Sequence, residues 1–109
     1  MPGKFLAEFE LYVMLAILRL GEGAYGGEVR REIESRTGRP VSIGALYATL
    51  ARLEGKGLIV LRRSTGEIRQ RGRARRYCRL TPAGEAALTH SAAMLARMMK
   101  GLRLLPAGK

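Results

Sequence analysis

The feature that most constrains the fold is the segment 42–63, SIGALYATLARLEGKGLIVLRR, because its hydrophobic pattern changes partway along. Leu46, Leu50 and Leu53 have the i, i+4, i+7 spacing of the buried face of a helix, and Ser42 can cap that helix. A Gly-Lys-Gly sequence ends the helix, and the β-branched run LIVLRR that follows predicts a strand. The chain therefore passes directly from an amphipathic helix into a strand that leads to many arginines.

The rest of the chain adds further short elements. Residues 5–20 are apolar on most sides, as in a central core helix whose polar positions are Glu8, Glu10 and Arg19. A glycine-rich turn, GEGAYGG, separates it from the next helix, in which Val29 and Ile33 point inward. The expected elements, besides the helix capped by Ser42, are helices at 5–20 and 27–38, strands at 58–63 and 75–80, and a last helix from Thr81-Pro82 toward Leu102 or beyond.

This order of three helices, a strand, a basic loop, a strand and a helix is the layout of a winged helix-turn-helix. We therefore predict an α+β fold, mostly α, with three helices, a β-hairpin wing and a C-terminal dimerisation helix. Residues 1–80 would form the DNA-binding domain, and residues 81–109 the dimerisation helix and tail. A chain of 109 residues can build one modest core, and association with a second copy would help to stabilise it.

The charge of the chain is strongly positive and unevenly distributed. Lysine and arginine together number 20 against 9 acidic residues, all glutamate, so the net charge is +11. Between Arg62 and Arg79 there are eight arginines and one acid, Glu67, so this short segment carries +7. Such an excess favours nucleic acid or an anionic membrane surface as the partner.

Composition also excludes several classes of protein. One cysteine and one histidine cannot form an internal disulfide or a Cys/His metal site, so neither metal nor cofactor is expected. The longest apolar run, residues 11–18, is too short to span a membrane, and the N-terminal residues do not resemble a signal peptide. No catalytic set of residues is apparent, so we expect a cytoplasmic protein that is not an enzyme.

The outward face of the helix capped by Ser42 is the predicted DNA-reading surface. Its small residues would let the backbone approach the major groove, and the positive end of the helix dipole favours a phosphate. Thr49 can contact a base edge or a phosphate, and Arg52 a phosphate. Tyr47 lies at the edge of the leucine stripe, where it either packs or donates a hydrogen bond to a phosphate. The candidates are Ser42, Gly44, Ala45, Tyr47, Ala48, Thr49 and Arg52.

The loop between the two strands supplies a second candidate surface. Arginine is always charged and its planar group suits phosphate, so a basic hairpin can follow the DNA backbone or enter a minor groove. The candidates are Arg69, Arg71, Arg73, Arg75 and Arg76. Three alternatives remain: a merely solvated arginine cluster, a small RNA-binding or ribosome-associated protein, and an interaction module that does not touch nucleic acid.

The last helix carries an apolar seam with spacings of 4, 3, 4 and 3, formed by Leu88, Ala92, Leu95, Met99 and Leu102. The seam predicts a homodimer, which would place two reading helices about 34 Å apart on a pseudo-palindromic operator. Packing against the first helix of the same chain is the alternative, and both contacts can coexist. Met94 and Met98 widen the seam, either as gap-filling residues or as the lining of a pocket for a small apolar effector.

Two further side chains have simpler interpretations. Cys78 is either a half-buried structural thiol or, if Arg76 and Arg79 lower its pKa, a redox sensor. His90 lies on the last helix and is expected to be solvated.

Several of these motifs resemble the PadR-like transcriptional regulators over about residues 11–88. The matching segments are Tyr25-Gly26, then SIGALYATLARLEGKGLI, then GRARRYCRLTPAGEAAL, which covers the reading helix, its exit and the second strand of the wing. The resemblance implies a dimeric winged-helix repressor whose last helix forms the dimer contact, and members of the family often respond to a small aromatic or cationic effector. Gly27 and Cys78 depart from the family pattern, because aromatic residues are often found at these two positions.

Overall fold

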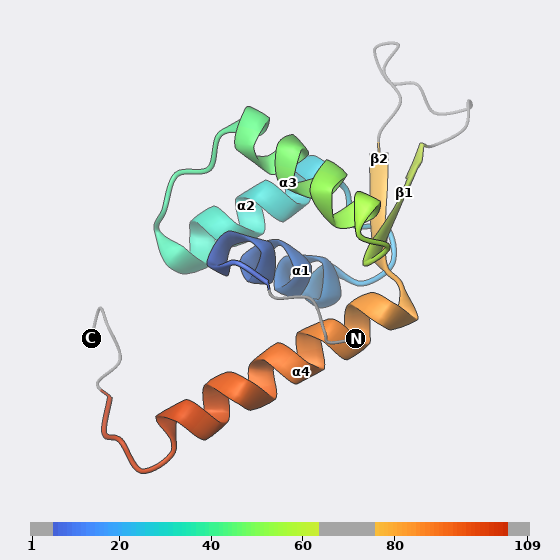
Figure 1. Cartoon of the computed structure of the whole chain (residues 1–109). Coiled ribbons are helices and arrows are strands. Elements are labelled where there is room, and N and C mark those ends of the chain that lie inside the picture. The colour runs from blue at the N-terminus through green and yellow to red at the C-terminus, as the bar shows by residue number, and fades with distance from the viewer. Residues whose placement is uncertain (1–5, 64–75, 105–109) are drawn as a thin grey trace.

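The computed structural model describes residues 6–63 and 76–104. Its elements are α1 (Glu8–Leu20), α2 (Gly26–Thr37), α3 (Ile43–Gly55), β1 (Ile59–Arg63), β2 (Arg76–Leu80) and α4 (Pro82–Met99). Figure 1 shows α1, α2 and α3 packed together, the hairpin beside the C-terminal end of α3, and α4 on the side of α1 away from α3. The predicted fold, mostly helical with a two-stranded hairpin, is confirmed.

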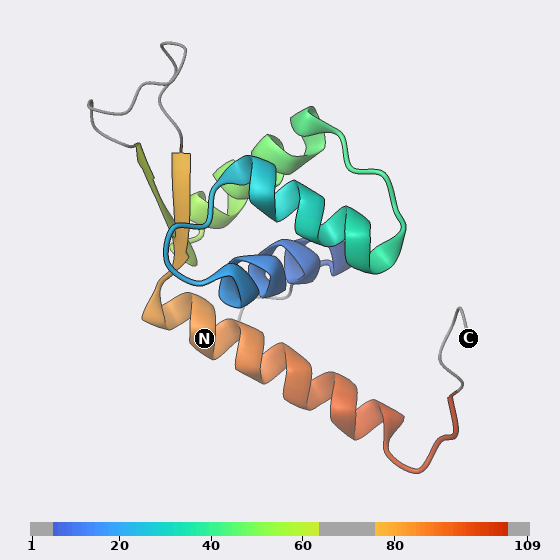
Figure 2. The ribbon, with the colours of Figure 1, turned by 180° about the vertical axis from the view of Figure 1, so that it is seen from behind.

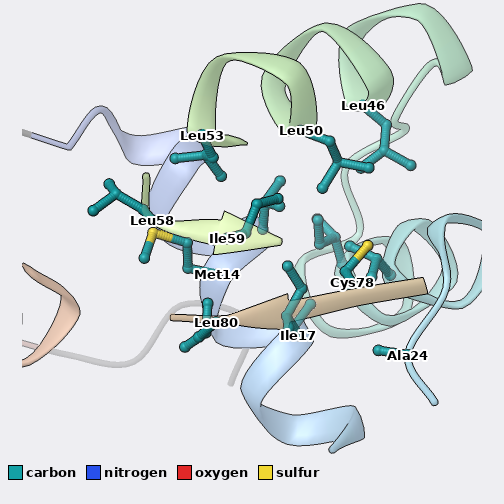
Figure 3. Packing of buried hydrophobic residues seen from close by; sticks show 14 of the residues in the cluster. Met14, Ile17, Ala24, Leu46, Leu50, Leu53, Leu58, Ile59, Cys78 and Leu80 are labelled. Carbon is teal, nitrogen blue, oxygen red and sulfur yellow. The ribbon is translucent and has the colours of Figure 1, made fainter. Parts of the chain in front are cut away.

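The core lies where α1 meets α3 and the hairpin. Met14 of α1 is fully buried, as are Leu46, Leu50 and Leu53 of α3. Figure 3 shows these three leucines pointing from α3 toward Met14 and the strands. Burying a leucine side chain stabilises a fold by about 1.5–3 kcal/mol, so the stripe is a main anchor of α3. The predicted burial of the leucine stripe is confirmed.

The hairpin is antiparallel, and its side chains alternate between the core and the outer face. Ile59 pairs with Leu80 and Leu61 with Cys78, and of these Ile59, Cys78 and Leu80 are buried. The alternation follows from the period of two along a strand. Both strands begin and end within one residue of the predicted bounds.

The segment between α1 and α2 does more than turn the chain. Tyr25 forms an isolated antiparallel bridge with Tyr77, and the Cys78 N–H donates to the Ala24 carbonyl oxygen at 2.8 Å. The segment therefore pairs with β2 on the edge that β1 leaves open. The sequence predicted only a glycine-rich turn here, because two residues are too few to show the alternation of a strand.

The start of α4 is fixed by a cap and a close contact. Thr81 Oγ1 accepts a hydrogen bond from the Gly84 N–H at 2.9 Å and donates one to the Gly57 carbonyl oxygen at 2.7 Å. A Cβ atom on residue 84 would overlap the Leu58 carbonyl oxygen, so only glycine fits where α4 meets the segment after α3. The predicted Thr81 cap, with Pro82 at the first helical position, is confirmed.

The end of α4 differs from the prediction. The helix ends at Met99 rather than at Leu102 or beyond, and the Leu102 N–H donates to the Met99 carbonyl oxygen in a turn. Gly101 lies in this turn and disfavours helix continuation by about 1 kcal/mol relative to alanine. Figures 1 and 2 show that α4 slopes away from α1 toward its C-terminal end.

Candidate nucleic-acid interface

The first turns of α3 present small residues to solvent. Ser42 Oγ accepts a hydrogen bond from the Ala45 N–H at 3.0 Å, which satisfies one of the free amides at the start of the helix. Gly44, Ala45 and Ala48 are exposed along with Ser42, as expected for the outward face. This surface therefore offers unobstructed backbone and the positive end of a helix dipole to an anionic partner.

The prediction that Thr49 lies on the exposed face of α3 is wrong. Its side chain is only 2% exposed, and its Oγ1 accepts a hydrogen bond from Arg52 Nη2 at 3.2 Å. Thr49 lies three residues after Leu46 and four before Leu53, so helical spacing places it at the edge of the buried stripe. In this position Thr49 cannot read a base edge, and it supports the arginine beside it.

Tyr47 lies on the other flank of α3 and is half-buried. A Cβ atom on Gly26, the first residue of α2, would overlap the Tyr47 hydroxyl, so the tyrosine packs directly over the start of α2. This contact supports the packing interpretation of Tyr47. Contact of the same hydroxyl with a phosphate remains a prediction.

A buried carboxylate of α1 holds the C-terminal part of α3. Glu10 lies in α1, and its side chain is 4% exposed. Its Oε2 accepts hydrogen bonds from Arg52 Nε at 3.2 Å and from Lys56 Nζ at 3.0 Å, and its Oε1 accepts one from the Ala7 N–H at 2.9 Å. Glu10 is therefore buried although it is charged, because two cations 42 and 46 residues away converge on it.

The ionisation of Glu10 follows from these contacts. Burial by itself raises the pKa of the carboxyl group, because it disfavours the charged form. Hydrogen bonds from the Ala7 N–H, Lys56 and Arg52 outweigh burial and hold the pKa below its ordinary value of 4.5. At neutral pH, Glu10 is therefore a buried anion shared by Arg52 of α3 and by Lys56, which caps the C-terminal end of α3.

The described part of the wing adds positive charge beyond α3. Arg62 and Arg79 are exposed on β1 and β2, next to Tyr77, whose ring packs edge-on against Tyr25 with centroids 6.1 Å apart. Figures 1 and 2 place α3, the end of β1 and the start of β2 on the side of the molecule opposite α4. Arg76 is the first residue of β2, and the other wing candidates, Arg69, Arg71, Arg73 and Arg75, lie outside the described residues.

The environment of Cys78 does not support a redox sensor. The residue is 3% exposed, and burial raises the pKa of its thiol to about 11. The structure therefore agrees with the alternative of a structural thiol, because the side chain points into the core rather than toward the outer face of the hairpin. A protonated, buried thiol is a poor nucleophile.

The apolar seam of α4 divides into two parts. Leu88 is 5% exposed and belongs to the core of its own chain, which agrees with the packing alternative for this residue. Farther along, Leu95 is 51% exposed, Met98 76% and Met99 46%, while Met94 is half-buried and Ala92 exposed. Leu102 is also exposed but lies beyond the helix, so it cannot continue the seam in helical register.

The described residues show neither a membrane span nor a metal cluster. Within 6–63 and 76–104, none of the helices has both the length and the apolar character needed to cross a bilayer. The same ranges contain no group of three or more His, Cys, Asp or Glu side chains arranged to hold a metal ion.

Comparison with known proteins agrees with this geometry. Residues 14–90 match the model of the transcriptional regulator PadR-like family. The transcriptional regulator Rv3488 of Mycobacterium tuberculosis is 49% identical over 65 residues, which are 60% of this chain and 56% of that protein. The matched part thus spans little more than half of that relative.

Solved structures of PadR proteins have the same fold. A PadR-like transcription factor from Bacteroides fragilis aligns with a TM-score of 0.70 and 26% identity, over 83% of this chain and 82% of its own. A PadR family regulator from Eggerthella lenta aligns with a TM-score of 0.65 and 28% identity, over 86% and 83%. With its helices, its two-stranded hairpin and a family match over most of its length, the chain belongs to the PadR-like family of transcriptional regulators.

Proposed function

We propose that this protein is a DNA-binding repressor that acts as a homodimer on a pseudo-palindromic operator. The observation that carries the proposal is that α3, the end of β1 and the start of β2 lie on one side of the molecule, opposite α4. Proteins that read DNA with a winged helix use such a helix and hairpin on one face. Binding across a promoter would block transcription, so repression is the sign of regulation we propose.

In this proposal α3 enters the major groove with its small N-terminal face. Ser42, Gly44, Ala45 and Ala48 offer few side-chain donors, so backbone amides and close approach would contribute more than hydrogen bonds to base edges. Arg52 would contact a phosphate beside the groove. The proposed division of the chain is residues 1–80 for DNA binding and 81–109 for dimerisation.

The dimer would form through the exposed apolar residues of α4 and α1. Leu95 and Met99 on α4, and Leu15 and Leu18 on α1, are each 43–52% exposed in the single chain. A two-fold interface would cover the exposed residues of α4 and of α1 together, because in such an interface the same surface of each subunit packs against the other subunit. Met98 is 76% exposed, and with Met94 it would line any effector pocket between the subunits.

The proposal is tested by comparing duplex DNA with structured RNA at matched salt concentration. We expect duplexes selected from a genomic library to bind with dissociation constants of about 10 nM or below, and structured RNA to bind far more weakly. Equal or tighter binding to RNA would favour an RNA-binding or ribosome-associated protein. Binding to neither would favour an interaction module.

The wing is tested by changing Arg73 and Arg75 to alanine together. If each meets one phosphate, affinity should fall for all duplex sequences, and the slope of log affinity against log salt should flatten by up to about 2. An unchanged slope would mean that these arginines do not contact the DNA backbone.

A further inference from the structure

We propose that Glu10 is a positioning residue for DNA binding, which holds Arg52 in the orientation that meets a phosphate. The inference rests on the proposed function, since it concerns how the reading helix presents its charge. Glu10 lies in α1 and would not itself touch DNA, because its side chain is 4% exposed.

The contacts of Glu10 fix one end of a small network. Its carboxylate accepts a hydrogen bond from the Ala7 N–H at the start of α1, and this contact within its own helix fixes its orientation. Arg52 and Lys56 both donate to the same oxygen, Oε2, at 3.2 and 3.0 Å. Arg52 lies in the last turn of α3 and Lys56 caps its C-terminal end, so the carboxylate holds the end of the reading helix.

The guanidinium group of Arg52 is held by hydrogen bonds along one edge, and its other edge is accessible to solvent. Its Nε donates to Glu10 and its Nη2 to Thr49 Oγ1, both at 3.2 Å, yet its side chain is 53% exposed. A guanidinium group is planar and has five N–H donors, so two contacts define its plane and leave donors for a phosphate. A group ordered in advance loses less conformational entropy on binding than a freely rotating one.

The network also keeps its excess charge on the solvent side. One buried anion faces two cations, and both cations are more exposed than the carboxylate, with 53% and 29% of their side chains accessible. The positive charge that remains therefore lies where an anionic partner can reach it. If the Glu10 charge only repelled DNA, removing it would strengthen binding. If Glu10 positions Arg52, removing it would weaken binding, so the two roles predict opposite results.

The test compares Glu10→Gln with Glu54→Gln in duplex binding over a range of salt concentrations. Each change removes one negative charge, but Glu54 is an exposed residue of α3 outside the network. Long-range electrostatics alone predicts tighter binding for both variants. Positioning predicts that Glu10→Gln weakens binding by about threefold or more and flattens the salt slope by about 1, while Glu54→Gln binds as tightly as the wild type or slightly tighter.

A double-mutant cycle with Arg52→Ala decides whether Glu10 acts through Arg52. Once Arg52 is absent, Glu10→Gln should cause no further weakening and no further change in salt slope. Equal weakening in both backgrounds, or an effect like that of Glu54→Gln, would overturn the proposal. If Glu10→Gln does not fold by circular dichroism, Glu10→Asp keeps the charge and shortens the reach, and it should weaken binding when Arg52 is present but not in the Arg52→Ala background. Failure of the wild type to bind duplex DNA would instead overturn the proposed function.

Discussion

The apolar stripes of α3 and α4 follow the same helical spacing but meet different surroundings. Leu46, Leu50 and Leu53 of α3 are fully buried against α1 and the hairpin. On α4 only the first member of the seam, Leu88, is buried, and Leu95 keeps half of its surface exposed. Periodicity therefore identifies an apolar face, but the arrangement of neighbouring elements decides whether the same chain covers it.

The slope of α4 accounts for the difference. The start of α4 is fixed to the rest of the domain through Thr81 and Gly84. In both views the distance between α4 and α1 increases toward the C-terminal end of α4. A long helix that leaves the core exposes its apolar side chains, and proteins in water usually cover patches of this kind with another surface. The comparison thus separates residues that stabilise the single chain from residues that would stabilise a dimer.

The largest expected effect is that of truncation within the stripe of α3. Leu50→Ala should lower the free energy of unfolding by about 3 kcal/mol, because the side chain is fully buried and its removal leaves a cavity. Leu95→Ala, the matched change on α4, should cost less than about 1 kcal/mol in a monomer, because half of that side chain is already in water. Urea denaturation of both variants at low protein concentration measures the difference, and equal losses would contradict the comparison.

A second prediction concerns the association of subunits. Leu95→Glu would bury a charge in the proposed interface and should weaken dimerisation by about 2 kcal/mol or more. Ala93→Glu adds the same charge to an exposed position of α4 outside the seam, so it should leave dimerisation unchanged. Sedimentation equilibrium gives both dissociation constants. A wild-type chain that is monomeric at working concentration, or equal effects of the two changes, would show that α4 is not the interface.

The attachment of α4 to the core is tested at Gly84. Gly84→Ala places a methyl group against the Leu58 carbonyl oxygen, so the helix start must shift, at a cost of about 2 kcal/mol. Gly44→Ala is a suitable control, because nothing lies within 4 Å of a Cβ at that exposed helical position, and it should be neutral or stabilising. Thermal unfolding followed by circular dichroism distinguishes them. Equal midpoints would mean that α4 can move without loss of stability.

Local features of the fold were predictable because their causes lie within a few residues. The Ser42 and Thr81 caps, the leucine stripe and both strands depend on short-range spacing and on backbone amides at helix starts. The exposure of Gly44, Ala45 and Ala48 followed from the same spacing. Whether these residues and the wing arginines contact DNA remains a prediction.

Features that depend on contacts distant in sequence were not predictable from one chain. Nothing near Glu10 in the sequence indicates that Arg52 and Lys56 will meet it. The bridge between Tyr25 and Tyr77 likewise depends on how α1 and α2 turn back onto β2. Thr49 was misplaced for a different reason, since a polar residue at the edge of a buried stripe can lie on either side of it.

The smallest expected effect is the acid sensitivity of the contact between α1 and α3. Because the folded pKa of Glu10 lies below 4.5, its charge stabilises the fold above that pH, and this contribution is lost as the pH falls through the folded pKa. The stability difference between the wild type and Glu10→Gln should therefore be constant near neutral pH and shrink as the pH falls below 4.5. Urea denaturation of both proteins from neutral to acidic pH measures this difference. The contributions of the other carboxylates cancel because both proteins contain them. A difference that grew on acidification would mean that burial outweighs the hydrogen bonds from Ala7, Lys56 and Arg52. In that case the neutral, protonated form of Glu10 would stabilise the contact between α1 and α3.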